Sequence, residues 1–166
     1  MPDDEVVVSD TSPLLNLALI DRLDLLESQF SAVVAPEHVW NELTDGEEGL
    51  EELRTLRDEG VLSIDGLEED ELYVEIAHEL DAGEAAAITY AIEHEADLTL
   101  LDEREGRRIA RRHGLSVTGV IGILLRGERE GTVDLKVELD SLRAEGFWIS
   151  DVLYADVLQQ DEQSPD

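Results

Sequence analysis

The sequence predicts an α/β fold in which helices cover both faces of a parallel sheet, and two observations support this prediction. Short apolar runs alternate along the chain with stretches whose apolar residues recur at helical spacing. Strands buried on both faces are uniformly apolar, whereas helices on their flanks show the longer period. In addition, 166 residues suffice for one domain with a real core but are too few for two ordinary ones.

The first strand and helix place an acid at one edge of this sheet. The apolar run 6–8 ends abruptly at Ser9 and Asp10, and helical spacing follows over about residues 13–28. Pro13 suits the first helical position, and Ser12 before it is a good N-cap. Because open parallel sheets bind ligands where strands end and helices begin, we expect Asp10 to lie at a ligand-binding edge.

The remaining elements continue the alternation. We expect further strands at 31–35, 61–64, 98–101 and 115–119, with 147–150 as an edge strand. We expect helices from Pro36 to a break at 45–49, then at 48–58, around 72–80, and at 83–95, 103–114, 120–130 and 133–146, before a short terminal helix. Residues 1–158 then form a single domain, and 159–166 form a disordered acidic tail.

The charge balance is extreme. Forty-two acids face twelve basic residues, for a net charge of −30, yet an apolar share of 42% is ordinary for a folded protein. Self-repulsion of this size is screened in strong salt, where the Debye length is only ~3 Å at 1 M. We therefore expect adaptation to a high-salt cytoplasm, as in a halophile. Acids that mimic nucleic acid are the alternative, but these acids are spread along the chain.

Several classes of protein are excluded or disfavoured by what the sequence lacks. With no cysteine, disulfides and thiolate metal sites are excluded. No apolar stretch approaches the length of a membrane span, and the N-terminus lacks the basic start of a signal peptide. We expect a cytoplasmic protein that does not bind membranes.

Four acids stand at positions that composition alone does not explain. Two end apolar strands, and two lean toward the inward faces of helices: Asp10, Asp102, Glu42 and Glu84. Glu84 shares a helical stripe with Ile88 and Ile92, where an unpaired charge is costly unless a metal or a partner offsets it. No positive charge is placed to neutralise the group. Oxygen ligands alone favour Mg²⁺ or Mn²⁺, which assist phosphodiester hydrolysis.

Each acid also has a plain structural explanation. Asp102 with Glu105, and Asp81 with Glu84, match a capping-box pattern. Asp10 could cap its own helix, and Glu42 could be solvated at a helix edge. Taken together, two strand-end aspartates and two inward-leaning glutamates favour a cluster over four separate caps.

A basic helix follows Asp102 directly. Five arginines fall within nine residues, namely Arg104, Arg107, Arg108, Arg111 and Arg112. Arginine clusters bind phosphate groups bidentately, so this helix is a candidate RNA-binding surface. The alternative is a solvated cationic face that pairs with neighbouring glutamates. The aromatic residues, among them Trp40, Phe147 and Trp148, are interpreted as core or interface residues rather than as a surface for stacking bases.

Segments over nearly the whole chain resemble the PIN domain family, specifically an uncharacterised PIN-like branch related to toxin–antitoxin ribonucleases. The matching segments are VVVSDTSPLLNL, VVAPEHVWNEL, LDAGEAAAI, LTLLDEREGRRIARRHGLSVTGVIGILL and SLRAEGFWIS. The resemblance implies a three-layer α/β/α sandwich with a central parallel sheet. It also implies a Mg²⁺- or Mn²⁺-dependent ribonuclease that leaves a 5′-phosphate, often the toxin of a toxin–antitoxin pair.

The family's acidic quartet corresponds to Asp10, Glu42, Glu84 and Asp102, and its polar helpers to Ser12 and Asn16. The third acid is often aspartate in the family and is Glu84 here, with Asp81 close by. We expect RNA as the substrate and consider a small antitoxin protein and a second copy of the chain as partners. An inactive PIN-like module that binds RNA or protein is the main alternative, and a phosphoaspartyl phosphohydrolase is a further one.

Overall fold

The computed structural model describes residues 5–163 and confirms the parallel sheet covered by helices. Five strands pair in the order β3-β2-β1-β4-β5, and every pairing is parallel. Their bounds are β1 Val7–Ser9, β2 Val33–Pro36, β3 Leu62–Asp65, β4 Leu98–Leu100 and β5 Val117–Thr118. All five strands are short, and the helices α1, α3, α7 and α8 begin within four residues of the ends of β1, β2, β4 and β5.

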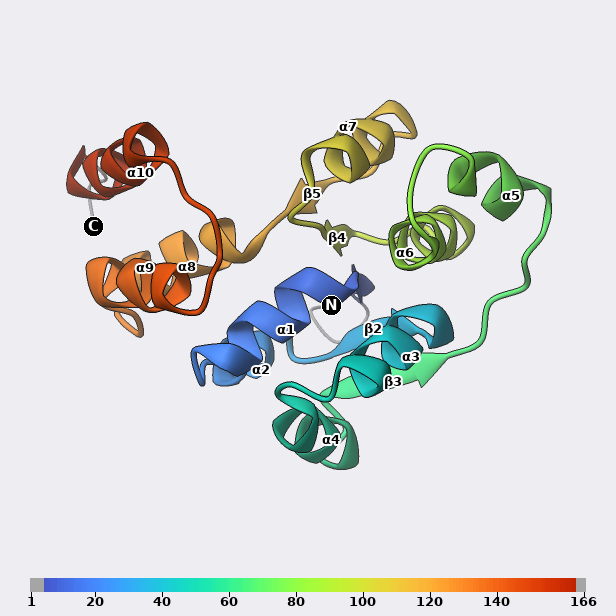
Figure 1. Cartoon of the computed structure of the whole chain (residues 1–166), viewed down its shortest axis with the longest axis horizontal. Coiled ribbons are helices and arrows are strands. Elements are labelled where there is room, and N and C mark those ends of the chain that lie inside the picture. The colour runs from blue at the N-terminus through green and yellow to red at the C-terminus, as the bar shows by residue number, and fades with distance from the viewer. Residues whose placement is uncertain (1–4, 164–166) are drawn as a thin grey trace.

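Two helical layers enclose the sheet (Figure 1). One contains α5 to α7, whose apolar side chains pack against Val8 and Leu101. The other contains α1 to α4 and α8 to α10, which pack on Val7, Val33 and Leu100. The helices are α1 Thr11–Leu19, α2 Asp24–Phe30, α3 Glu37–Gly46, α4 Leu50–Asp58, α5 Glu71–Ala77, α6 Ala82–Glu93, α7 Arg104–Arg112, α8 Val120–Arg129, α9 Leu135–Ala144 and α10 Asp151–Gln163.

The first predicted helix is in fact two. α1 begins at Thr11, so Asp10 and not Ser12 is its N-cap residue, and Pro13 lies within the first turn. The chain leaves the helix after Leu19, and Asp21 takes a positive φ of 58° before α2 starts. A non-glycine residue in that left-handed region gives no reliable sequence signal, which is why the apolar pattern alone suggested a continuous helix.

The end of the chain also differs from the prediction. Residues 147–150 form a loop and not an edge strand, because the Arg143 side chain binds the Ile149 carbonyl at 2.9 Å and no neighbouring strand takes up their backbone. α10 continues to Gln163, so residues 159–163 are helical where a disordered tail was expected. Val157 is buried and anchors this helix on the core, which lets its polar end continue. Residues 164–166 lie outside the described part.

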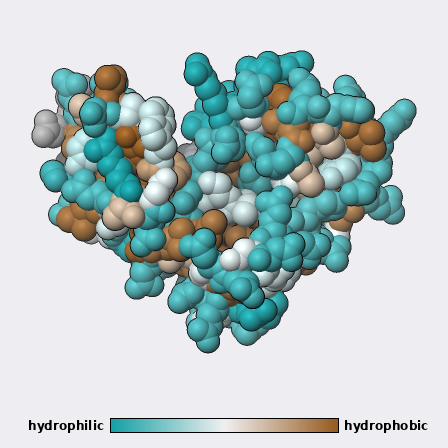
Figure 2. Space-filling model, viewed as in Figure 1, coloured by the Kyte–Doolittle hydropathy of each residue, from teal (hydrophilic) through white to brown (hydrophobic). Residues whose placement is uncertain are grey.

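Figure 2 shows hydrophilic side chains over most of one face of the molecule, with apolar ones in small patches between them. Within residues 5–163, none of the helices combines the length and the apolar character needed to cross a membrane.

Candidate active site at the carboxyl edge of the sheet

Asp10 and Asp102 follow neighbouring strands at the carboxyl edge. β1 and β4 pair in parallel with Ser9 opposite Leu100, and the backbone N–H of Asp10 donates to the Leu100 carbonyl at 3.0 Å. Between these two strands the order of the sheet reverses, since β2 and β3 extend to one side and β5 to the other. The crevice at such a reversal is where open α/β sheets bind ligands. The two aspartates therefore lie where the sequence placed them.

Glu42 on α3 and Glu84 on α6 reach the same edge. The hydroxyl group of Thr11, next to Asp10, donates to the Glu42 carboxylate at 2.7 Å. Gly83, next to Glu84, lies against that same carboxylate: a Cβ on Gly83 would come 2.5 Å from Glu42 Oε1. Glu84 is buried, while Glu42 is exposed, as its solvated alternative anticipated.

Asp10 is buried without the partners that a buried carboxylate needs. Its side chain is 4% exposed, and its Oδ1 atom has no hydrogen-bond partner. Burial raises the pKa of Asp10 to about 7, the Thr11 backbone N–H opposes the rise, and the carboxylates of Asp81, Glu42 and Asp102 add to it. Although Asp10 precedes α1, its side chain makes no capping bond, so the capping explanation for this residue is wrong.

Glu84, like Asp10, is buried with one carboxylate oxygen that lacks a hydrogen-bond partner. This oxygen is its Oε2 atom. Burial raises the pKa of Glu84 to about 8, and the nearby carboxylates of Asp81, Asp10 and Glu103 raise it further. Asp81 does act as a cap, because its carboxylate accepts the backbone N–H of Glu84 at 2.9 Å. Asp81 thus caps α6 and also adds negative charge beside both buried acids.

Asp102 is, by contrast, fully hydrogen-bonded. Its Oδ1 accepts the backbone N–H of Val120 at 2.8 Å, and its Oδ2 accepts the Ser12 hydroxyl at 2.9 Å. The Asn16 amide in turn donates to Ser12 at 2.9 Å. Burial raises the pKa of Asp102, and these donors oppose the rise. The alternative explanation of Asp102 as the cap of α7 is wrong, because Glu103 precedes that helix and Asp102 accepts the first N–H of α8 instead.

Three glycines make room for the acids. A Cβ on Gly83 would meet Glu42 at 2.5 Å, one on Gly106 would meet Glu84 Oε2 at 2.7 Å, and one on Gly119 would meet Asp102 Oδ1 at 2.5 Å. Real Cβ atoms essentially never come so close, so each position accepts only glycine while these carboxylates keep their places. A glycine directly beside an expected site acid is the signal that could have found Gly83, next to Glu84, whereas Gly106 and Gly119 are distant in sequence from the acids that they accommodate.

The donor set fits a hard cation in its chemistry. Carboxylate oxygens are the ligands that Mg²⁺ and Mn²⁺ prefer, and two of them here are buried without a partner. As the side chains stand, however, no three acid or histidine side chains among the described residues are arranged to hold one metal ion. The site therefore has the oxygens and the negative charge for a cation, but not a finished coordination shell.

The arginines of α7 divide into two groups. Four are exposed and, with Glu105, line an open hollow of about 480 Å³: Arg104, Arg108, Arg111 and Arg112. Arg108 pairs with Glu105 at 2.8 Å, as the alternative explanation anticipated for the whole helix. Arg107 is half-buried instead, its Nε has no partner, and its pKa is lowered by burial and by Arg111, while Asp102 opposes the shift. The expectation that no positive charge lies near the acids is therefore wrong at Arg107.

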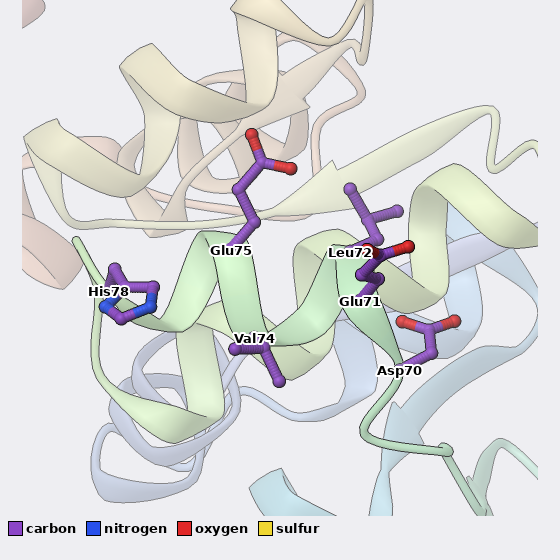
Figure 3. A pocket seen from close by; sticks show the side chains of 6 residues that line it. All are labelled: Asp70, Glu71, Leu72, Val74, Glu75 and His78. Atoms are coloured by element: carbon purple, nitrogen blue, oxygen red, sulfur yellow. The ribbon is translucent and has the colours of Figure 1, made fainter.

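A separate hollow of about 860 Å³ lies over α5 (Figure 3). Its six lining side chains all come from one stretch of chain, namely Asp70, Glu71, Leu72, Val74, Glu75 and His78. In Figure 3 they point in different directions along the helix and do not converge on one point. This hollow lacks the convergent polar groups of a reaction site.

Comparison with known proteins agrees with the fold. The sequence model of the PIN domain family DUF3368 matches residues 6–163. The chain belongs to the PIN domain family. PIN domains are in general metal-dependent nucleases, which agrees with an oxygen-only donor set at the strand ends. No curated protein matches the sequence.

One solved structure with this fold is a PilT N-terminus domain protein from the hyperthermophilic archaeon Sulfolobus solfataricus. The match has a TM-score of 0.57 at 15% sequence identity, and it covers 81% of this chain and 93% of the other. At that identity the likeness concerns the fold alone.

Proposed function

We propose that this PIN domain is a metal-dependent endoribonuclease whose Mg²⁺ or Mn²⁺ is held by Asp10, Glu42, Glu84 and Asp102. The observation that supports this most is the pair of buried carboxylate oxygens, on Asp10 and Glu84, that have no partner. An unpaired charge in such a place is expensive, and a divalent cation offsets it. When bound, the cation would lower the pKa of a water molecule and neutralise charge on the leaving oxygen.

The other residues orient the acids and the substrate. Ser12 and the Val120 N–H hold Asp102 in one direction, and Thr11 does the same for Glu42. Arg107, beside Asp102, would bind the phosphate next to the cleaved bond, and the exposed arginines of α7 would bind the RNA backbone farther along. The same proposal includes a toxin role with a small antitoxin protein as its partner. It also includes a second copy of the chain as another partner and a high-salt cytoplasm as the setting.

The test is cleavage of a labelled single-stranded RNA with Mn²⁺ in molar KCl. Asp10→Asn and Asp102→Asn should each abolish cleavage while the circular dichroism spectrum stays that of the parent. Glu51→Gln, an exposed acid on α4, is the matched control and should cleave at the parent's rate. Wild-type cleavage by either aspartate variant would show that the site is misassigned.

Calorimetric titration with Mn²⁺ separates the alternatives. An active enzyme should bind Mn²⁺ in the parent form and lose that binding in Asp10→Asn. A parent protein that binds RNA but no Mn²⁺ would instead be an inactive binding module. A phosphoaspartyl phosphohydrolase would hydrolyse a small phosphomonoester and leave RNA intact.

A further inference from the structure

A groove of about 530 Å³ opens beside Asp102, between α1, the turn from β4 into α7, and the loop 145–150. Ser12, Asn16 and Asp102 line it together with Phe147 and Trp148. Figure 2 shows this face of the molecule hollowed between the side that carries α10 and the side that carries α7. One continuous groove therefore joins an acid of the candidate site to two aromatic side chains that are remote from it in sequence.

Trp148 is held in place although it is exposed. Its side chain is 81% exposed, whereas sequence analysis placed it in the core or an interface. On one side, the Phe147 backbone N–H donates to the Leu142 carbonyl at 3.0 Å. On the other, Ile149 is buried and its carbonyl accepts the Arg143 guanidinium. The indole ring thus projects from a fixed backbone, as a flat surface for stacking requires.

The charges of the groove decide which part of a nucleotide it suits. Its lining carries Glu48, Glu103 and Glu145 besides Asp102, against the single arginine Arg104. Phosphate groups are repelled by such a wall. Nucleobases are uncharged, stack on aromatic rings, and donate N–H groups that carboxylates accept. Guanine offers two adjacent N–H donors and uracil only one. The carboxylates that line the groove therefore favour guanine over uracil.

We propose that Trp148 is the stacking platform for one base of a single-stranded RNA bound at the acid cluster, and that Glu48 and Glu145 favour guanine there. This inference rests on the proposed function, because it makes RNA the ligand of the groove. It adds to that function a base contact that does not depend on electrostatic attraction. Stacking should persist in concentrated salt, in which contacts between arginine and phosphate weaken.

Fluorescence of Trp148 tests this without any cleavage. Trp40→Phe leaves Trp148 as the only tryptophan, and EDTA prevents metal-dependent cleavage during the titration. In molar KCl, the tetranucleotide UUGU should quench the fluorescence and bind several-fold more tightly than UUUU. UUIU, in which inosine lacks the guanine amino group, should fall between the two. In the full chain with both tryptophans, Trp148→Ala should weaken binding of labelled UUGU roughly 5- to 150-fold.

Two further variants guard against indirect effects. Trp148→Phe keeps an aromatic ring and should retain most of the affinity. Val137→Ala removes another exposed apolar side chain, on α9, and should bind RNA as the parent does. Absence of quenching, or unchanged affinity in Trp148→Ala, would overturn the stacking platform. Equal binding of UUGU and UUUU would overturn the preference for guanine.

The result is independent of the cleavage test. Quenching by RNA in a protein that never cleaves it would sustain the base site and reject the nuclease. If the protein cleaves RNA but Trp148→Ala leaves its RNA affinity unchanged, the nuclease is supported and the base site is rejected. If Trp148→Ala changes only the oligomeric state in size-exclusion chromatography, the exposed side chains Trp148, Val152 and Leu153 form a protein contact, and the proposal fails.

Discussion

Asp10 and Asp102 each follow a buried strand, and β1 and β4 are neighbours, yet their surroundings are opposite. The carboxylate of Asp102 receives the Val120 N–H and the Ser12 hydroxyl, one on each oxygen. Asp10 is 4% exposed and leaves Oδ1 without a partner. The comparison shows that one position in the fold can serve two purposes. Asp102 is fixed in direction by the protein, whereas Asp10 carries a charge that the protein alone does not stabilise.

The largest expected effect concerns Asp10. Its pKa is raised from 3.8 to about 7 in the folded protein, so the folded state favours the protonated form. The resulting contribution to stability is present below about pH 4 and is lost as the pH rises through 7. In EDTA, unfolding by urea should give a free energy that falls over this range, by up to about 4 kcal/mol from this group.

Asp10→Asn removes that dependence and isolates its source. The variant should be more stable than the parent at pH 8 and nearly equal to it at pH 4. Net charge makes the parent's stability fall with pH too, so the difference between the two proteins is the quantity to measure. A variant less stable than the parent at pH 8 would mean that Asp10 Oδ1 has a partner after all.

A middle effect concerns the glycine behind Asp102. In Gly119→Ala the new methyl group would lie 2.5 Å from Asp102 Oδ1 and 3.1 Å from the Leu101 carbonyl, so the carboxylate must leave the Val120 N–H. Overpacking of this kind costs about 1–3 kcal/mol. Gly46→Ala is the matched control, since a Cβ there meets nothing within 4 Å, and its thermal midpoint should not fall. Equal midpoints for the two variants would contradict a fixed Asp102.

The smallest effect concerns the hydroxyl group that holds Asp102. Ser12→Ala removes a donor to Asp102 and the acceptor of the Asn16 amide, which should cost about 1 kcal/mol in chemical denaturation. Because this donor lowers the pKa of Asp102, its loss should also raise that pKa further, which NMR titration of the carboxyl carbon would report. Ser63→Ala, at an exposed position on β3, is the control and should change neither quantity. An unchanged Asp102 pKa in Ser12→Ala would show that the bond is unimportant.

The edge of the sheet could be predicted because buried strands are apolar to their last residue. The runs ending at Asp10 and Asp102 therefore marked the carboxyl edge without any structure, and the Ser12 contact agrees with the resemblance to PIN domains. What the sequence did not reveal depends on three-dimensional neighbours. A helical pattern shows that Arg107 shares a face with Arg111, but not that it lies beside Asp102.

Trp148 illustrates the same limit more strongly. Aromatic residues are usually buried, and nothing in residues 147–150 distinguishes an exposed ring from a buried one. Only the bonds that fix Phe147 and Ile149 determine that the ring between them faces solvent. The break after Leu19 is similar, because aspartate takes a positive φ only occasionally, so the identity of Asp21 does not reveal the break.

Because of the strand order, the four acids of the candidate site come together only late in the synthesis of the chain. β1 lies between β2 and β4, and β4 begins about ninety residues after β1 ends. During synthesis the ribosome releases β1, β2 and β3 with Asp10 and Glu42 long before it releases β4, and Asp102 follows β4. A nascent or truncated chain that stops before β4 therefore holds Asp10, Glu42 and Glu84 but lacks Asp102 and the strand that positions it. If the protein cleaves RNA as proposed, the translating ribosome is exposed to a complete active site only after nearly two thirds of the chain has been made.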